Sequence, residues 1–304
     1  MSAIILDGRK TREALMPELI SRVKTFSFAP ILAIIQVGDR PDSSSYIRAK
    51  ESFAKKIGVE CKIMKVSDAV SQQEIIEIVK ECNADKSIKG IIVQLPLPIS
   101  LDRDTIINTI DPHKDVDGLT PFQVKAWSQG REDAVLPATA RGVRQLLKQY
   151  DISLFGKRVT VVGRSMLVGK PIISMCLNEN ATVTVCHSKT EDLAFYTKKA
   201  DILIVAAGKP GLIQKKHTNK KQIVVDVGIN TVGVISGESD RLGYAGGSKL
   251  EKLENEIEGK KLVGDVDFDK IQKSVAAITP VPGGVGPMTV LSLFENLLDL
   301  CETE

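Results

Sequence analysis

The 304-residue sequence is poor in the residues that bind metals or form disulfides. It has three histidines, at positions 113, 187 and 217, and none has a partner at metal-ligand spacing, so no metal site is expected. Its five cysteines form no Cys-x-x-Cys pair, and their odd number is typical of reduced thiols. The sequence therefore predicts a cytoplasmic protein that binds no metal.

Long apolar runs and an excess of one charge are also missing. No apolar run approaches the roughly 18 residues that a membrane span needs. Asp7, Arg9 and Lys10 interrupt the N-terminus before a signal-like core could form. The net charge is only +3, and the densest basic run, at 215–221, has no interleaved aromatic residues. Membranes and nucleic acids are therefore not expected partners.

What the sequence does contain is an alternation of apolar runs and amphipathic segments. One helix-length stretch repeats Ile75, Ile76, Val79 and Cys82 at helical spacing. The strand-like runs cover residues 31–37, 59–66, 88–95, 158–163, 181–187, 201–207 and 222–228. This rhythm predicts an α/β fold with parallel sheets flanked by helices.

The strand-like runs form two groups, which predicts two domains. An amphipathic stretch at 137–151 would link them, and a terminal helix could return to the first domain. We expect a first domain of residues 1–138 plus 286–304 and a second domain of residues 139–285. The charged, Gly-rich stretch 231–261 is expected to form surface structure.

A nucleotide site is predicted in the stretch "RVTVVGRSMLVGKP", where a strand, a tight turn at Gly163 and a helix follow one another. Ser165 and the first backbone N–H groups of that helix could donate to a pyrophosphate. The alternative is a glycine-containing turn that binds no cofactor.

The end of the next strand bears on the choice of cofactor. An NAD site usually has a carboxylate there for the ribose, whereas this sequence has His187, Ser188 and Lys189. Together with Arg164, these neutral or basic groups suit a 2′-phosphate and favour NADP. Lys189 could also be merely exposed.

In the first domain, Tyr46 and Lys50 are four residues apart, so they would share a helix face and could reach one substrate. The same spacing occurs in short-chain dehydrogenases, and a solvated helix face is the simplest alternative. Gln94 ends the third strand, at the edge where ligands bind in open α/β sheets.

Asp115 and Asp117 follow in "DPHKDVDG". A calcium loop is excluded because His113 and Val124 stand where acidic ligands would be needed. A carboxylate here could accept N–H bonds from a flat heterocycle, or it could satisfy the backbone of its own turn. Both interpretations remain open from the residues alone.

Eight motifs together resemble the bifunctional methylenetetrahydrofolate dehydrogenase/cyclohydrolase family over nearly the whole chain. They are "YIRAK", "GIIVQLPLP", "KDVDG", "VVGRSMLVGKP", "ATVTVCHSKT", "VVDVGIN", "VGDVDF" and "TPVPGGVGPMT", in family order. A short-chain dehydrogenase would carry its Gly-rich turn before the Tyr–Lys pair, whereas Gly163 comes far after it. The resemblance implies an N-terminal α/β catalytic domain and a Rossmann-like NADP-binding domain with a parallel sheet, with the active-site cleft between them.

The resemblance also implies roles for individual residues. Lys50 would be the catalytic residue, assisted by Tyr46 and Gln94, and Asp117 would bind the pterin ring. The implied substrate-binding residues are Tyr46, Lys50, Val93, Gln94, Leu95, Asp117, Pro282, Gly283 and Gly284, the last three in a loop that closes over the folate. The implied NADP contacts are Thr139, Gly163, Arg164, Ser165, Ser188 and Ile229, with Ile229 on the nicotinamide side.

The implied activity is NADP-dependent oxidation of 5,10-methylenetetrahydrofolate, followed by hydrolysis of the methenyl product to 10-formyltetrahydrofolate. A homodimer that contributes to purine biosynthesis is implied as well. The alternatives are a dehydrogenase without cyclohydrolase activity and a non-catalytic folate- or NADPH-binding regulator. For proton transfer Lys50 must be partly neutral, which requires its pKa to fall by roughly 3 units, or about 4 kcal/mol.

Three positions depart from the family pattern. The usual P-C-T-P-x-G reads "PATARG", which could alter the hinge between domains, and Asp42 replaces the usual Ala. The 231–261 stretch is longer than is typical of the family.

Overall fold

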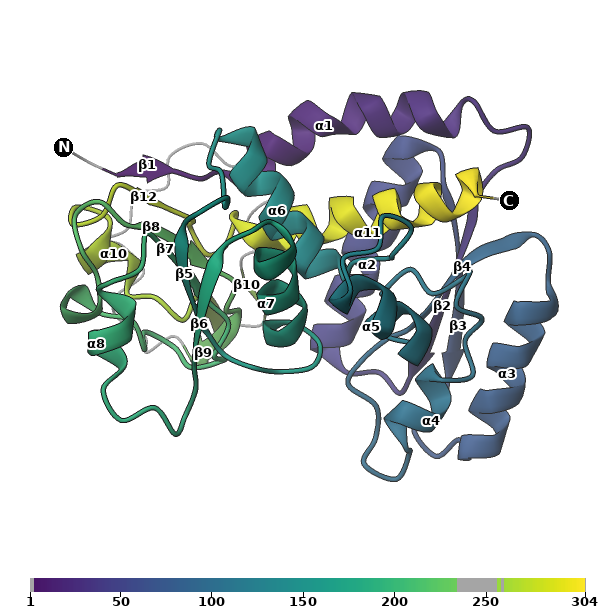
Figure 1. Ribbon diagram of the computed structural model, residues 1–304. Helices are drawn as coiled ribbons and strands as arrows, with labels where there is room; N and C mark the ends of the chain where they lie inside the picture. The colour runs from purple at the N-terminus through teal and green to yellow at the C-terminus, as the bar shows by residue number, and fades with distance from the viewer. Residues whose placement is uncertain (1–2, 234–255, 258–259, 304) are drawn as a thin grey trace. The chain divides into compact units, whose positions relative to one another are not determined.

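In the computed structural model, which describes residues 3–233, 256–257 and 260–303, strands and helices alternate along the chain (Figure 1). The chain divides into two compact units. Unit 1 comprises Met1–Arg9 and Leu146–Gly286, and unit 2 comprises Lys10–Gln145 and Pro287–Glu304. The predicted α/β class with two domains is confirmed.

Unit 2 is built on a three-stranded parallel sheet of order β3-β2-β4. Its strands are β2 (Ile31–Val37), β3 (Glu60–Val66) and β4 (Ile88–Val93). Helix α3 (Gln72–Ala84) starts with a capping box between Ser71 and Glu74. Its buried residues Ile75, Val79 and Cys82 pack against the sheet, as their helical spacing predicts.

Two further helices pack with this sheet in unit 2. These are α2 (Pro41–Ile57) and α11 (Val285–Glu302), and the rings of Phe53 and Phe294 bring them together at 5.5 Å between centroids. Gly90 in β4 leaves room for α11, because a Cβ there would collide with Leu297. The terminal helix therefore belongs to the core of unit 2.

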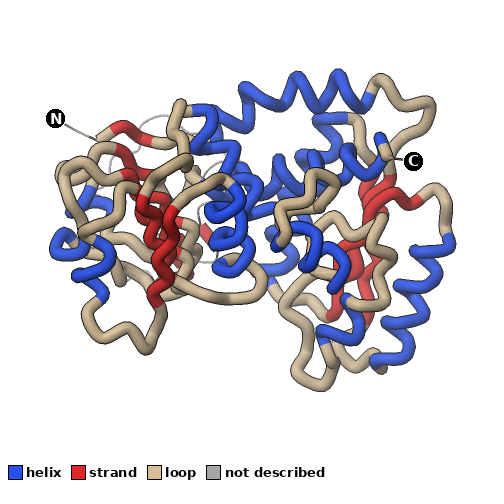
Figure 2. Tube along the Cα trace, viewed as in Figure 1, coloured by secondary structure: helices blue, strands red, loops and turns tan. Residues whose placement is uncertain are grey.

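The chain between β4 and α6 (Ala138–Gln149) is mostly loop, interrupted by the short helices α4 (Arg103–Ile107) and α5 (Pro121–Ser128) (Figure 2). Helix α1 (Gly8–Val23) precedes the first strand of unit 2. Arg22 near its end forms ion pairs with Asp299 and Glu302 of α11.

Unit 1 contains a six-stranded parallel sheet of order β1-β12-β8-β7-β5-β6. Its strands are β1 (Ile4–Ile5), β5 (Arg158–Val162), β6 (Thr182–Cys186), β7 (Ile202–Val205), β8 (Ile223–Asp226) and β12 (Ala277–Ile278). Four of them fall within predicted strand runs. The connection from β5 leads to β6 on one side, whereas that from β7 leads to β8 on the other. The strand order therefore reverses between β5 and β7, and in open α/β sheets such a reversal marks a ligand-binding crevice.

The helices that lie wholly within the described part of unit 1 are short apart from α7. They are α7 (Gly169–Asn178), α8 (Leu193–Thr197), the 3-10 helix η1 (Lys215–His217) and α10 (Phe268–Ile271). A buried cluster joins Val162, Leu203, Val205 and Val224 of the strands to Ile271 of α10. This core fixes the carboxyl ends of the central strands.

Strands β1 and β12 were not predicted, because two residues carry no detectable periodicity. Residues 3–6 lie in unit 1 rather than in the first domain expected from the sequence, since Ile4 and Ile5 pair with Ala277 and Ile278. Hydrogen bonds from Gly8 and Arg9 to the carbonyl of Gly283 extend this attachment.

A second, antiparallel sheet in unit 1 has the order β10-β11-β9. Its strands are β9 (Asn230–Gly233), β10 (Glu256–Ile257) and β11 (Lys260–Val263). The stretch predicted as surface structure at 231–261 lies largely outside the described residues, and its described ends are strands. Among the described residues no helix has the length and apolarity that crossing a membrane requires.

Candidate functional site

The side chains of Lys50 and Gln94 are joined in unit 2. Lys50 lies in the middle of α2, and its Nζ donates a hydrogen bond of 3.0 Å to Oε1 of Gln94, the residue after β4. The Gln94 amide nitrogen donates to the carbonyl of Leu95 at 2.8 Å, which leaves its oxygen for Lys50. Gln94 therefore fixes where the half-buried lysine points.

Tyr46 lies one turn before Lys50 on the same helix, and its side chain is 45% exposed. The chain just before it is held by Ser44, whose hydroxyl accepts from Gln36 Nε2 at 3.1 Å and donates to Asp39 at 2.9 Å. The helix face predicted from the four-residue spacing thus exists, with Lys50 inside and Tyr46 toward solvent.

The two aspartates of the turn between α4 and α5 have different surroundings. Asp115 is 1% exposed, and its carboxylate accepts backbone N–H bonds from Gly118 at 2.9 Å and Thr120 at 2.7 Å. The Asp117 carboxylate accepts no hydrogen bond from any described residue. Asp115 is the structural residue that one interpretation expected, and Asp117 is the residue available to a ligand.

Several buried contacts hold this turn in place. Asn296 of α11 donates to the carbonyls of Val116 at 2.9 Å and Leu136 at 3.0 Å. The Trp127 indole donates to the carbonyl of Gly118 at 2.9 Å. Gly118 has φ 67°, and a Cβ there would collide with the Val135 carbonyl, so no other residue fits. Asp117 is therefore presented by a rigid backbone.

Burial and the partner's charge shift the pKa values of Lys50 and Asp117 in opposite directions. Burial lowers the pKa of Lys50 below its ordinary value, although the Asp117 charge pulls it back upward. Burial likewise raises the pKa of Asp117, and the Lys50 charge offsets part of that rise. Burial also raises the pKa of Asp115 to about 6, against the backbone hydrogen bonds of Thr120. A lysine that loses its proton more easily than usual can act in proton transfer near neutral pH.

In unit 1, the turn after β5 has the geometry of a nucleotide-binding turn. Gly163 has φ 124°, and a Cβ there would collide with the carbonyl of Ala206, the residue after β7. A Cβ at Gly169, the first residue of α7, would collide with the backbone of Gly163 and Arg164. Backbone, turn and helix N-terminus are thus packed as closely as a pyrophosphate site requires.

The polar groups around this turn are exposed. Ser165 Oγ accepts the N–H of Gly169, the first residue of α7, at 3.3 Å, and the hydroxyl keeps its own proton for donation. Arg164, Ser188 and Lys189 all have exposed side chains. The turn that carries Ser188 is held by a bond from the Lys189 N–H to the His187 ring at 3.2 Å.

Other predicted residues are distributed over both units. Ile229 is 43% exposed in unit 1, and a Cβ on Gly286 would lie 3.8 Å from it. Pro282, Gly283 and Gly284 also lie in unit 1, whereas Thr139 lies in unit 2 beside Thr289, 3.4 Å between hydroxyls. Thr139 is therefore in a different unit from the other predicted NADP contacts. Likewise, the loop 282–284 is in a different unit from the other predicted folate contacts.

Val93 and Leu95 flank Gln94 differently. The Val93 side chain is buried in the core of unit 2, so only its backbone could face a ligand. Leu95 is half-buried, and its carbonyl holds the Gln94 amide.

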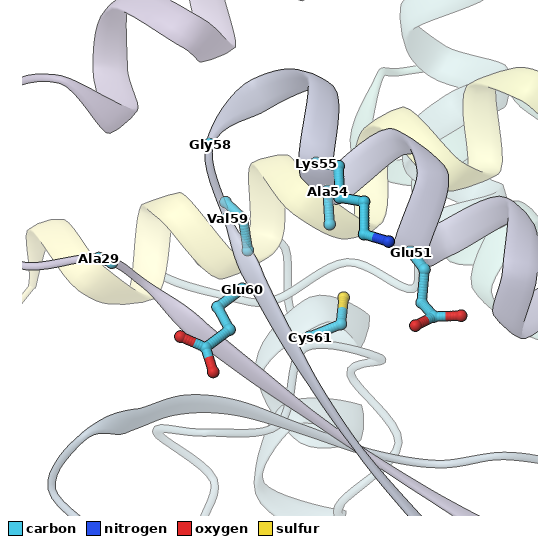
Figure 3. Close-up of a pocket in the computed structure, with 8 residues that line it drawn as sticks. All are labelled: Ala29, Glu51, Ala54, Lys55, Gly58, Val59, Glu60 and Cys61. Atoms are coloured by element: carbon cyan, nitrogen blue, oxygen red, sulfur yellow. The ribbon is translucent and has the colours of Figure 1, made fainter.

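A cavity of about 340 Å³ opens at the other end of the unit 2 sheet (Figure 3). Its lining residues are Ala29, Glu51, Ala54, Lys55, Gly58, Val59, Glu60 and Cys61. It lies where β3 begins, whereas ligands of open parallel sheets bind where strands end. Burial raises the pKa of its Cys61 thiol to about 11, so this is not a reactive cysteine. The described residues also contain no cluster of His, Cys, Asp and Glu that could hold a metal ion.

Comparisons with known proteins agree across both units. A family model for the catalytic domain of tetrahydrofolate dehydrogenase/cyclohydrolase matches residues 6–117, and one for its NAD(P)-binding domain matches residues 137–304. The chain is 41% identical over 300 residues to the bifunctional protein FolD of Bacillus subtilis, covering 97% of this chain and 96% of that protein.

Solved structures give the same result. The Campylobacter jejuni FolD methylenetetrahydrofolate dehydrogenase/cyclohydrolase superposes with a TM-score of 0.88 at 38% identity, covering 99% of both chains. The Trypanosoma brucei enzyme, solved with NADP and an inhibitor, gives a TM-score of 0.90 at 35% identity, covering 100% of this chain and 98% of that one.

We expect the Asp117→Asn substitution to lower the pKa of Lys50 further. The lost negative charge is one that favours the ammonium form, so the neutral fraction of Lys50 would rise at a given pH near its midpoint. NMR titration of ¹³Cε-labelled lysines would measure this, with the Lys50→Met variant used to identify the resonance. Asp104→Asn, at an exposed position, is the control, and an unchanged or raised midpoint in Asp117→Asn would contradict the expected coupling.

Proposed function

The chain belongs to the tetrahydrofolate dehydrogenase/cyclohydrolase family, and we propose that it catalyses both reactions of that name. It oxidises 5,10-methylenetetrahydrofolate with NADP and hydrolyses the methenyl product to 10-formyltetrahydrofolate. The observation that carries the proposal is the bond between Lys50 and Gln94 beside a turn that presents Asp117 without a hydrogen-bond donor from the described residues.

The folate would be held by residues of unit 2. Asp117 can accept N–H bonds from a flat, amide-bearing ring such as a pterin, and a rigid turn reduces the entropy lost on binding. The buried contacts of Asn296 and Trp127 supply that rigidity. Tyr46, Gln94, the Val93 backbone and Leu95 complete the proposed substrate contacts in unit 2. The assignment of Pro282, Gly283 and Gly284 to the folate rests on the family resemblance alone.

The NADP-binding residues would be those of the turn after β5 and the end of β6. The turn at Gly163 fits a pyrophosphate because Gly163 and Gly169 bring backbone close to backbone there, with no side chain to block the approach. Exposed Arg164, Ser188 and Lys189 fit a 2′-phosphate, and Ile229 offers an apolar surface to a nicotinamide. When bound, NADP accepts the hydride from the one-carbon unit. The contribution of Thr139 is inferred from the resemblance only.

In the hydrolytic step, Lys50 would move the protons. Water attacks the methenyl carbon, and a neutral Lys50 takes a proton from that water. The bond between this carbon and N5 of the adduct then breaks, N5 takes up a proton, and the adduct hydroxyl loses its own proton to give the formyl group. A cationic folate intermediate would disfavour the ammonium further and so increase the neutral fraction. The hydrogen bond with Gln94 keeps Nζ in one place during this transfer. An intact Lys50–Gln94 pair therefore favours the bifunctional enzyme over a dehydrogenase without cyclohydrolase activity or a non-catalytic regulator.

We also propose that the protein works in the cytoplasm and that its product supplies formyl groups for purine biosynthesis. All five cysteines have free thiols, which suits a reducing compartment. Cell fractionation followed by immunoblotting would identify the compartment that contains the protein. Recovery outside the cytoplasmic fraction would refute this assignment.

Replacing Lys50 by Met should remove cyclohydrolase activity while the protein stays folded. General acid–base groups contribute about 10²- to 10⁴-fold, so we expect a loss of at least about 100-fold in kcat for methenyltetrahydrofolate hydrolysis. The assay follows the fall in methenyl absorbance. Lys56→Met, at an exposed position of the same helix, should retain the rate. A Lys50→Met enzyme with a normal rate would exclude Lys50 as the catalytic residue.

Replacing Arg164 and Lys189 by Ala should weaken the preference of the enzyme for NADP over NAD. Each cation can form a charge-assisted bond with a 2′-phosphate, so the KM for NADP should rise about tenfold or more in the double variant. The KM for NAD, which lacks that phosphate, should change little. Lys157→Ala, just before β5, is the control. Equal changes in both KM values would show that these residues do not read the phosphate.

A homodimer is proposed from the family resemblance and from the edge of the unit 1 sheet. Strand β6 ends that sheet, and Val185 on it is 38% exposed, so an apolar edge is open to a second copy. Sedimentation should give twice the mass of the chain. Val185→Lys should shift the equilibrium toward the monomer, whereas a monomeric wild-type protein would refute the dimer.

A further inference from the structure

The carboxylate of Asp265 lies at 0% exposure in unit 1 and accepts four hydrogen bonds. Three come from consecutive backbone N–H groups, of Ala207 at 2.6 Å, Gly208 at 2.9 Å and Lys209 at 2.8 Å. The fourth comes from Nδ2 of Asn230 at 2.9 Å. Consecutive N–H groups that converge in this way form an anion-binding nest, and here the protein fills the nest with its own side chain.

The groups that Asp265 holds border the proposed NADP site. Residues 207–209 directly follow Ala206, whose carbonyl packs so closely on Gly163 that no side chain fits between them. Asn230 directly follows Ile229, the exposed apolar residue proposed to face the nicotinamide. Asp265 thus joins the loop after β7 to Asn230, the first residue of β9, at the carboxyl edge where the strand order reverses.

A second buried carboxylate holds Asp265 itself. Asp226, at 2% exposure, accepts the backbone N–H bonds of Asp265 at 3.0 Å and Val266 at 2.9 Å, together with that of Gly228 at 3.0 Å. The backbone N–H of Asp226 donates in turn to the Thr279 hydroxyl at 2.7 Å. Asp265 is therefore held both at its backbone N–H group and at its carboxylate.

The two carboxylates leave no room for side chains beside them. A Cβ on Gly228 would collide with the Asp265 carboxyl group, and one on Gly264 would collide with that of Asp226. Burial raises the pKa of Asp226 to about 7, despite backbone hydrogen bonds from Val266 and Asp265, and the nearby Asp265 charge adds to the rise. Burying two acids together is costly, and here every bond they accept orders a loop.

We propose that Asp265 is a positioning residue of the NADP site, which acts by holding residues 207–209 and Asn230 in the arrangement that accepts the cofactor. The inference rests on the proposed function, because it concerns NADP. It assigns to the "VGDVDF" motif a function in cofactor binding through the backbone rather than through contact with the cofactor. Asn cannot replace Asp265, since all four partners are donors and an amide NH₂ would face at least one of them.

The test is direct titration of each variant with NADPH, followed by nicotinamide fluorescence. For Asp265→Asn we expect a rise in Kd of about tenfold, as expected when buried N–H groups lose their acceptor. In turnover the KM for NADP should rise by a similar factor with a smaller change in kcat. The matched control is Asp267→Asn in the same motif, because Asp267 pairs with Lys270 at the surface. That control should bind NADPH as the wild type does.

A milder variant covers the case in which Asp265→Asn does not fold. Asn230→Ala removes one of the four bonds and leaves the three backbone bonds and Asp226 in place, so a rise in Kd of about threefold is expected. Circular dichroism melting shows which variants are folded. The inference is overturned if folded Asp265→Asn, or Asn230→Ala when the former is unfolded, binds NADPH within the error of the wild type.

The same experiment separates this inference from the proposed function. If the wild-type protein neither binds NADPH nor oxidises methylenetetrahydrofolate, then the proposed function fails and the inference fails with it. If the wild type does both and the variants bind NADPH normally, only the positioning inference fails.

Discussion

Buried carboxylates that accept backbone N–H bonds hold the loops at the carboxyl ends of both sheets. Asp115 does so in unit 2, and Asp226 and Asp265 do so in unit 1. Moving a carboxylate out of water costs several kcal/mol, and each charge-assisted bond returns about 1.5–3 kcal/mol. Two or more such bonds therefore roughly balance the cost. The raised pKa values, about 6 for Asp115 and about 7 for Asp226, show that burial still exceeds this compensation.

Two other charged groups, Asp117 and Lys50, lack the full set of hydrogen bonds that these three buried carboxylates have. Asp117 is two residues from Asp115 in the same turn, yet it accepts no hydrogen bond from the described residues, and Lys50 has only the neutral Gln94 oxygen as its hydrogen-bond partner there. Groups that a fold leaves incompletely paired are expected where a ligand completes the pairing. The rigid turn and the incomplete pairing thus belong together, because an unsatisfied carboxylate on a mobile loop would find water or a neighbour instead.

The sequence was sufficient for features whose signal is local. Apolar runs located the seven strands β2 to β8, helical periodicity located helix α3, and the spacing of Tyr46 and Lys50 placed them on one helix. The two-residue strands β1 and β12 gave no periodic signal, so the attachment of Ile4 and Ile5 to unit 1 was missed. Only the family resemblance singled out Asp117. The residue pattern alone could not separate Asp115 from Asp117, since their difference arises from which backbone N–H groups fold back onto each carboxylate. Asp226 lies in "VVDVGIN" and Asp265 in "VGDVDF". An acidic residue at the end of an apolar run was the only sequence signal of their buried contacts.

The loop Pro282–Gly284 shows why a motif alone cannot give a shape. Prolines make a chain stiff and glycines let it approach other segments closely, but neither defines the conformation that a loop adopts. In the structure, Gly283 has φ 108°, and its carbonyl accepts the N–H bonds of Gly8 at 2.9 Å and Arg9 at 3.2 Å. These donors are the first backbone N–H groups of α1, which have no acceptor within their own helix. A Cβ on Gly8 would collide with the Gly284 carbonyl, so Gly8 must be glycine for the two segments to meet. The conformation of this loop is therefore set by residues at the opposite end of the chain, a long-range constraint that no local pattern in "TPVPGGVGPMT" encodes.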